Sequence, residues 1–136
     1  PPPPPPVVER AAPVVEAPPV QQVCPAQEFI VYFAWDRSEL NADGQRVLDE
    51  AVAQARQCNV NGVVISGFTD TSGSPTYNLA LSQRRANIVR DGLVSRGIGT
   101  DFISTEAAGE SRLSKPTGDG VREPLNRRSV IAITFR

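Results

Sequence analysis

Residues 60–97 contain the pattern from which the fold can be inferred. It begins with Val60-Asn-Gly-Val-Val-Ile-Ser-Gly-Phe68, continues with Thr69-Asp-Thr-Ser-Gly-Ser-Pro75, and ends with the block TYNLALSQRRANIVRDGLVSRG. The first block is short, apolar and β-branched, which predicts a strand. The second consists of turn-forming residues. The third predicts a helix over residues 76–96 that stops at Gly97, a natural C-cap. Together they predict a strand, a turn and a helix.

One charged side chain lies on the apolar face of this predicted helix. At about 100° per residue, Arg85 falls in the middle of a face that is formed by Leu81, Ile88, Val89, Gly92 and Leu93. A guanidinium in that position should be at least partly buried, and burial is tolerated only when a carboxylate or a ligand satisfies its donors. Arg84 points instead toward solvent. We therefore expect Arg85 to have a specific partner.

Asp70 is the obvious partner in sequence, because it follows the strand at the end where α/β folds place ligand sites. If the two charges are held apart, Asp70 can bind an ammonium while Arg85 binds a carboxylate through two parallel hydrogen bonds. Such a pair would grip a zwitterion. The alternative is a direct salt bridge between Asp70 and Arg85 that ties the loop to the helix. Residue spacing alone favours the bridge.

The same loop offers a metal-site pattern. Asp70, Ser72 and Ser74 match the D-x-S-x-S motif of von Willebrand A-type domains, in which one carboxylate and two hydroxyls bind Mg²⁺. That fold is longer and needs further ligands, and small polar residues are frequent in ordinary turns. A metal-dependent adhesion domain is therefore the second hypothesis.

The flanking sequence extends the alternation of strands and helices. We expect strands over residues 29–35, 102–107 and 129–135, a helix that begins at Ala42 with Asn41 as its cap, and a polar loop over 109–128. The resulting order is β-α-β-α-β-loop-β.

A Pro-rich segment precedes this region. Ten of the 13 prolines lie in residues 1–25, which predicts an extended polyproline II linker, followed by a domain over residues 26–136. A Pro-rich ligand for a small recognition domain is the alternative. Because the first residue is proline and not methionine, we expect a piece of a longer chain.

Composition excludes several functions. With 14 basic and 15 acidic residues the net charge is −1, so nonspecific binding to nucleic acid is disfavoured. There is no histidine, which excludes His-based acid/base catalysis, serine-protease triads and His-containing zinc sites. Cys24 and Cys58 favour a disulfide in an oxidising compartment over two buried thiols. Such a bond would close a loop of about 35 residues, worth about 3 to 4 kcal/mol.

Several separated motifs, in the right order, resemble the OmpA-like C-terminal domain that anchors outer-membrane proteins to peptidoglycan. They are Phe33-Ala-Trp-Asp-Arg-Ser-Glu-Leu40, Gly67-Phe-Thr-Asp70-Thr-Ser-Gly73, Tyr77-Asn-Leu-Ala-Leu-Ser-Gln-Arg-Arg-Ala86, Gly109-Glu-Ser-Arg112 and Asn126-Arg-Arg128. This resemblance implies an α/β (α+β sandwich) fold, a βαβαβ-type domain with a mixed sheet packed by helices.

The resemblance also implies a ligand, the meso-diaminopimelate residue of the peptidoglycan stem peptide. Asp70 and Arg85 match the two side chains with which the family grips it, and this favours the clamp over the salt bridge. By the same positional match, supporting contacts are expected from Asp36, Thr69, Asn78 and Arg127.

From this resemblance we expect a noncatalytic wall-binding module without a cofactor, in the periplasm of a Gram-negative bacterium. Its partners would be peptidoglycan and, through a missing N-terminal part, the outer membrane. A wall-degrading enzyme is disfavoured because the sequence offers no plausible pair of nucleophile and base. Replacing Asp70 or Arg85 by alanine is expected to abolish most wall binding and to leave the domain folded.

Overall fold

Strands and helices alternate along the chain in the computed structural model, which describes residues 1–6 and 24–136. The elements are β1 (Gln27–Tyr32), α1 (Ala42–Arg56), β2 (Val60–Phe68), α2 (Pro75–Ser95), the short 3₁₀ turn η1 (Thr100–Phe102), β3 (Ile103–Gly109), a second 3₁₀ turn η2 (Pro124–Asn126) and β4 (Arg128–Phe135).

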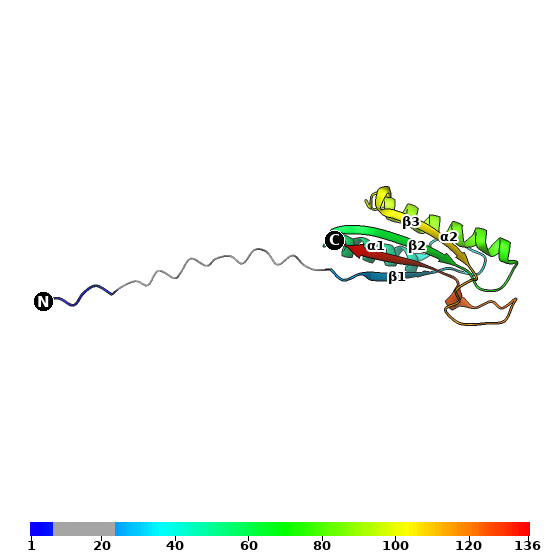
Figure 1. Cartoon of the computed structure of the whole chain (residues 1–136), viewed down its shortest axis with the longest axis horizontal. Helices are drawn as coiled ribbons and strands as arrows, with labels where there is room; N and C mark the ends of the chain where they lie inside the picture. The colour runs from blue at the N-terminus through cyan, green and yellow to red at the C-terminus, as the bar shows by residue number, and fades with distance from the viewer. Residues whose placement is uncertain (7–23) are drawn as a thin grey trace.

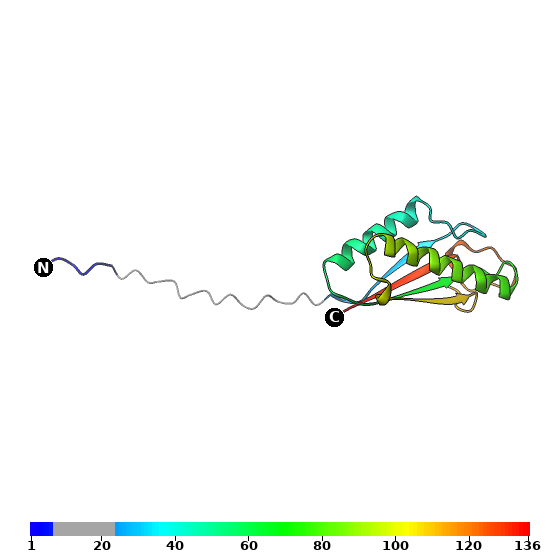
Figure 2. The same ribbon diagram turned by 90° about the horizontal axis from the view of Figure 1, so that it is seen from above.

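The strands form one mixed sheet in the order β1-β4-β2-β3. The last strand, β4, lies between β1 and β2 and runs antiparallel to both, whereas β2 and β3 are parallel. Figures 1 and 2 show that α1 and α2 lie across the same face of this sheet. The predicted fold class, a mixed sheet packed by helices, is confirmed.

The core lies between the sheet and the two helices. Each strand alternates between buried and exposed residues, as a half-covered sheet requires. The fully buried side chains include Val31, Val63, Ile65, Ile131 and Ile133 from the strands and Leu48, Val89 and Leu93 from the helices. The opposite face of the sheet keeps side chains such as Ile30 and Val64 exposed.

The start of α2 is fixed by local sequence. The Ser74 side chain caps the helix by accepting a hydrogen bond from the Tyr77 backbone N–H, and Pro75 occupies the first turn, where a missing N–H costs nothing. Gly67 then lets the helix approach β2, because a Cβ at this position would lie 1.9 Å from the backbone oxygen of Ser82. This close approach sets the position of Arg85 relative to the end of β2.

Element boundaries at the other strands differ from those predicted. The first strand was expected to run to Trp35 but β1 ends at Tyr32. Beyond it, the Phe33 N–H donates to the backbone oxygen of Arg127 at 2.9 Å, and Asp36 adopts a positive φ of 53°, so the chain turns away from the sheet. Strand β3 starts one residue later than expected, after the 3₁₀ turn, and continues to Gly109.

Cys24 and Cys58 are bonded, so the predicted disulfide is confirmed. It joins the segment before β1 to the turn between α1 and β2, with the two Cα atoms 6.3 Å apart. Residues 7–23 of the predicted linker lie outside the described residues, and the division at residue 25 stays a prediction. Within the described ranges, every helix is too short or too polar to cross a membrane.

Candidate ligand-binding site

A pocket of about 120 Å³ opens where β1 and β2 end. It is lined by residues from the segment after β1, the loop after β2 and the first turns of α2: Trp35, Asp36, Asp70, Ser72, Gly73, Tyr77, Asn78, Leu81 and Arg85. Four of the six predicted site residues therefore meet here. The other two, Thr69 and Arg127, lie outside the lining.

Arg85 lies at the floor of this pocket and is completely buried. Its guanidinium donates to three backbone carbonyls: Nε to Arg37 at 2.9 Å, Nη1 to Phe68 at 3.0 Å and Nη2 to Ala34 at 3.3 Å. These bonds fix its plane between the segment after β1 and the end of β2. A guanidinium has five N–H groups, so one N–H on each terminal nitrogen is left for another acceptor.

The buried guanidinium keeps its charge. Burial lowers the pKa of Arg85 to about 10, while the carboxylates of Asp70 and Asp36 oppose that shift, so the side chain is a cation at neutral pH. The ring of Phe33, 5.2 Å from the guanidinium carbon, covers one side. In the described part of the chain no carboxylate forms an ion pair with Arg85. The positive charge of Arg85 is therefore buried without a carboxylate paired directly to it.

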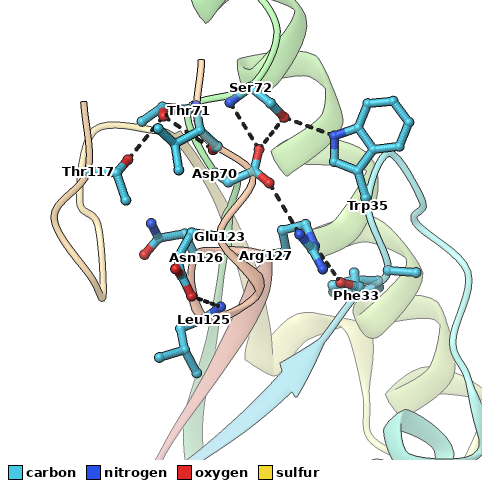
Figure 3. Close-up of polar contacts among 12 residues, drawn as sticks. Phe33, Trp35, Asp70, Thr71, Ser72, Thr117, Glu123, Leu125, Asn126 and Arg127 are labelled. Carbon is cyan, nitrogen blue, oxygen red and sulfur yellow. Dashed lines mark hydrogen bonds and ion pairs between the residues drawn. The ribbon is translucent and has the colours of Figure 1, made fainter. Parts of the chain in front are cut away.

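Asp70 is also buried, at 3% exposure, but it faces other partners. Its Oδ1 accepts from the Ser72 N–H at 3.1 Å and the Ser72 hydroxyl at 2.6 Å, while Oδ2 lies 3.4 Å from Nη1 of Arg127 (Figure 3). The ion pair of Asp70 is therefore with Arg127, 57 residues later. The alternative of a direct salt bridge between Asp70 and Arg85 is wrong.

Two predicted supporting residues hold the loop that carries Asp70. The Asn78 amide is buried and donates to the backbone oxygens of Asp70 at 3.2 Å and Ser72 at 2.8 Å. Arg127 donates through Nε to the backbone oxygen of Phe33 at 3.1 Å, so it bridges Asp70 to the chain that follows β1. Thr69 is buried too, and among the described residues its hydroxyl has no hydrogen-bond partner.

The pocket rim contains two aromatic side chains that the clamp hypothesis did not include. Trp35 donates its indole N–H to the Ser72 hydroxyl at 3.0 Å, and that hydroxyl donates to Asp70 (Figure 3). Tyr77 donates its hydroxyl to Asp36, and this hydrogen bond raises the pKa of Tyr77. The sequence signal that could have pointed to this rim is the single tryptophan of the chain, directly before Asp36 at the end of the predicted strand.

A long-range network fixes the loop between β3 and β4 against the pocket. The Thr71 hydroxyl donates to the backbone oxygen of Gly118 at 2.6 Å and accepts from the Val121 N–H at 3.1 Å. Asn126 is fully buried and bonds both the N–H and the C=O of Lys115, each at 2.8 Å. Both residues stand in the quoted motifs, but sequence reasoning missed their role because their partners lie in an irregular loop.

The D-x-S-x-S residues are engaged in other roles. Ser74 caps α2, the Ser72 hydroxyl is donated to Asp70, and the guanidinium of Arg127 lies against the same carboxylate. A cation at Asp70 would face positive charge from both Arg127 and Arg85. Because this repulsion grows with the charge of the cation, it disfavours a divalent metal more than a singly charged group. The metal-site alternative stays a prediction.

Comparison with known proteins decides the family. Residues 32–127 match the sequence pattern of the OmpA family. This range includes all the residues that line the pocket. The chain belongs to the OmpA family. The resemblance drawn from the separated motifs is thereby confirmed.

This OmpA-family chain is similar to named outer-membrane proteins. It is 37% identical over 115 residues to an outer membrane protein of Gluconacetobacter diazotrophicus, a match that covers 80% of this chain and 30% of that protein. It is 34% identical over 102 residues to the peptidoglycan-associated lipoprotein of Pasteurella multocida, covering 75% of this chain and 68% of the lipoprotein. The names agree with the predicted location on the periplasmic side of a Gram-negative outer membrane.

Solved structures share the fold. The crystal structure of the peptidoglycan-associated lipoprotein from Burkholderia pseudomallei superposes with a TM-score of 0.66 at 28% identity, covering 78% of this chain and 90% of that one. Against longer relatives the match is partial. The chain spans 30% of the Gluconacetobacter protein and 46% of outer membrane protein A from Citrobacter freundii.

Proposed function

We propose that this OmpA-family domain binds peptidoglycan noncovalently through the meso-diaminopimelate residue of the stem peptide, and that it anchors an outer membrane to the cell wall. The free end of diaminopimelate carries an ammonium and a carboxylate on one carbon atom. Asp70 would accept hydrogen bonds from the ammonium, and Arg85 would donate to the carboxylate.

The observation that carries this proposal is the state of Arg85. A completely buried cation with two uncommitted N–H groups at the floor of a pocket is a receptor for a planar anion that accepts two hydrogen bonds. Asp70 lies in the same lining but is not paired with it. Opposite charges held apart in one small pocket complement a zwitterion.

The family supports the same ligand class. The lipoproteins from Pasteurella and Burkholderia are named for their association with peptidoglycan, and they share 34% and 28% of residues with this chain. Membership of the OmpA family agrees with a noncatalytic binding role. In the periplasm, many such domains acting together would hold the wall firmly through avidity, even when each bond is modest.

A sacculus pull-down tests the ligand and the site together. The protein is incubated with purified diaminopimelate-type sacculi and, separately, with lysine-type sacculi, which lack the second zwitterionic end. We expect retention on the first kind alone, and loss of retention in Asp70→Asn. The matched control is Asp49→Asn, which removes an aspartate that pairs with Arg96 at 2.8 Å and lies outside the pocket.

Two further outcomes separate the proposal from its rivals. Retention should weaken at high salt, because screening reduces attraction between charges at a pocket open to water. Equal retention on both kinds of sacculus, or retention by Asp70→Asn as strong as by Asp49→Asn, would contradict the diaminopimelate clamp.

A further inference from the structure

A second cation lies beside the pocket in an unusual setting. The guanidinium carbon of Arg122 lies 3.5 Å from the centre of the Trp35 ring, so the guanidinium stacks directly on the indole. Trp35 itself lines the pocket and is 42% exposed. Arg122 itself does not line the pocket, so the stacking places a positive charge just outside it, against a side chain of its rim.

The indole beneath Arg122 is held in place. Its N–H donates to the Ser72 hydroxyl at 3.0 Å, and that hydroxyl donates to Asp70 at 2.6 Å. Figure 3 shows Trp35, Ser72 and Asp70 joined in this order. The platform for Arg122 is therefore oriented by the same carboxylate that is proposed to bind the ligand ammonium.

The backbone that carries Arg122 is fixed as well. The N–H of Val121, the residue before it, donates to the Thr71 hydroxyl at 3.1 Å, and the Gly120 N–H donates to the Thr71 backbone oxygen at 2.9 Å. Two adjacent residues are thus anchored to the loop that also carries Asp70. A side chain held at both its backbone and its guanidinium loses little conformational entropy when it binds a ligand.

Arg122 has no acidic partner in the part of the chain that the structure describes. Two other exposed arginines do pair with a carboxylate, Arg46 with Asp43 and Arg112 with Glu106. The neighbouring Glu123 is directed elsewhere, because it lies 3.6 Å from Lys115 and accepts from the Leu125 N–H. The hydrogen-bond donors of Arg122 are available to an external anion.

We propose that Arg122, stacked on Trp35, binds a second carboxylate of the same stem peptide. The inference rests on the proposed function, because the clamp must first hold the zwitterionic end of diaminopimelate. The rest of the peptide must then leave the pocket past its rim. That part of the stem peptide carries two free carboxylates: the α-carboxylate of the γ-linked D-glutamate, and the main-chain carboxylate of diaminopimelate in a tripeptide.

The test compares free meso-diaminopimelate with the tripeptide L-Ala-γ-D-Glu-meso-diaminopimelate. Trp35 is the single tryptophan of the chain, so its fluorescence reports binding at the site. We expect Arg122→Gln to weaken tripeptide binding about fivefold to tenfold, as loss of a charge-assisted contact should. Free diaminopimelate also carries the main-chain carboxylate. Its binding should therefore change less than twofold when Arg122 binds the glutamate α-carboxylate, and should weaken as much as tripeptide binding when Arg122 binds the main-chain carboxylate.

Amidated tripeptides identify the carboxylate. One carries an amide in place of the glutamate α-carboxylate, the other in place of the main-chain carboxylate of diaminopimelate. The amidated tripeptide that lacks the recognised carboxylate should bind the unmodified protein as weakly as the parent tripeptide binds Arg122→Gln. When this amidated tripeptide is tested with Arg122→Gln, affinity should fall no further. If neither amide couples to Arg122→Gln, the inference is overturned.

Arg84→Gln is the matched control, because Arg84 is an exposed arginine that also lies over a rim aromatic, Tyr77, at 5.8 Å. If Arg84→Gln and Arg122→Gln lower tripeptide affinity equally, the overall positive charge of the surface is responsible, and a specific subsite at Arg122 is overturned. Failure of the unmodified protein to bind diaminopimelate would overturn the proposed function itself. If the unmodified protein binds diaminopimelate tightly but Arg122→Gln binds the tripeptide as well as the unmodified protein does, the subsite alone is overturned.

Discussion

The two ends of the sheet are stabilised by different means. At the pocket end, the turns and loops are held by buried polar side chains, among them Asp70, Asn78, Arg85 and Asn126. At the opposite end, where the chain enters the domain (Figure 1), a disulfide joins Cys24 to Cys58. A mainly apolar hollow of about 170 Å³, lined by residues such as Val52 and Phe102, lies at that end of the helices.

On the proposed function, this contrast separates the end that binds the ligand from the end where the chain enters the domain. A pocket for a charged ligand must keep buried charges, and each of them has to be satisfied by precisely placed carbonyls and amides. The opposite end, where the chain enters the domain, has no such constraint, and there a covalent bond between Cys24 and Cys58 joins the segments. Because β1 and β2 both run from the disulfide toward the pocket, Cys24 and Cys58 join the starts of the two strands that lead to Asp36 and Asp70.

The largest effect is expected when Arg85 is removed. Arg85→Ala should lower the free energy of unfolding by about 3–5 kcal/mol, because it leaves a cavity and deprives three carbonyls of their donor. Complete burial thus revises the sequence-based expectation that this variant would simply stay folded. Urea unfolding, followed by Trp35 fluorescence, measures the loss.

Arg84→Ala is the control for that measurement, since Arg84 is the exposed neighbour on the same helix. It should change stability by no more than about 0.5 kcal/mol. If the two variants were equally stable, the carbonyl cage around Arg85 would not contribute to the fold, and the pocket end would not depend on its buried polar groups.

The second-largest effect is expected from removal of the disulfide between Cys24 and Cys58. Replacing Cys24 and Cys58 together by serine should lower the unfolding free energy by about 3–4 kcal/mol, because the unfolded chain regains the freedom of a closed loop of about 35 residues. Diaminopimelate affinity should stay within twofold, since neither cysteine lines the pocket. Calorimetric unfolding and ligand titration of the same samples test both statements.

The unsubstituted protein treated with a reductant serves as the control, and it should match the double variant in stability. An affinity that fell along with stability would mean that the two ends are coupled through β1 and β2. Ligand affinity at the pocket would then depend on the disulfide at the other end of the sheet.

Sequence predicted the elements whose pattern is local. The bounds of β2 match residue for residue, α2 agrees within one residue at each end, and the burial of Arg85 follows from its place on the helix. Periodic burial and capping are decided by neighbours within a few residues, so they can be read along the chain. The family motifs then brought Asp36 and Asn78 to the same site.

Sequence did not predict contacts that form across loops. The pairing of Asp70 with Arg127 spans 57 residues, and the stacking of Arg122 on Trp35 joins two irregular segments. Neither segment has a periodic pattern, and the relative positions of the two depend on β4 entering the sheet between β1 and β2. Asp70, Arg85 and Arg127 could therefore be named in advance as candidates, whereas the pairing of Asp70 with Arg127 could not.

The smallest effect sharpens the comparison within the pocket end. Thr71→Val keeps the shape of the side chain but removes the hydroxyl that bonds Gly118 and Val121. We expect a loss of about 1–2 kcal/mol in stability, because two partly buried hydrogen bonds to the backbone are removed. Faster hydrogen exchange at the Val121 amide should accompany it, measured by NMR.

The matched control is Thr134→Val, the same substitution at an exposed site on β4 that makes one long contact, at 3.4 Å, to Gly62. It should be neutral within about 0.5 kcal/mol. Thr71→Val should also weaken binding of the parent tripeptide more than binding of the amidated tripeptide that lacks the carboxylate recognised by Arg122, because Arg122 follows the anchored Val121 while Arg85 is held by carbonyls elsewhere. Equal weakening of both ligands would mean that Thr71 supports the clamp through Asp70, and the loop between β3 and β4 would then have no separate part in recognition.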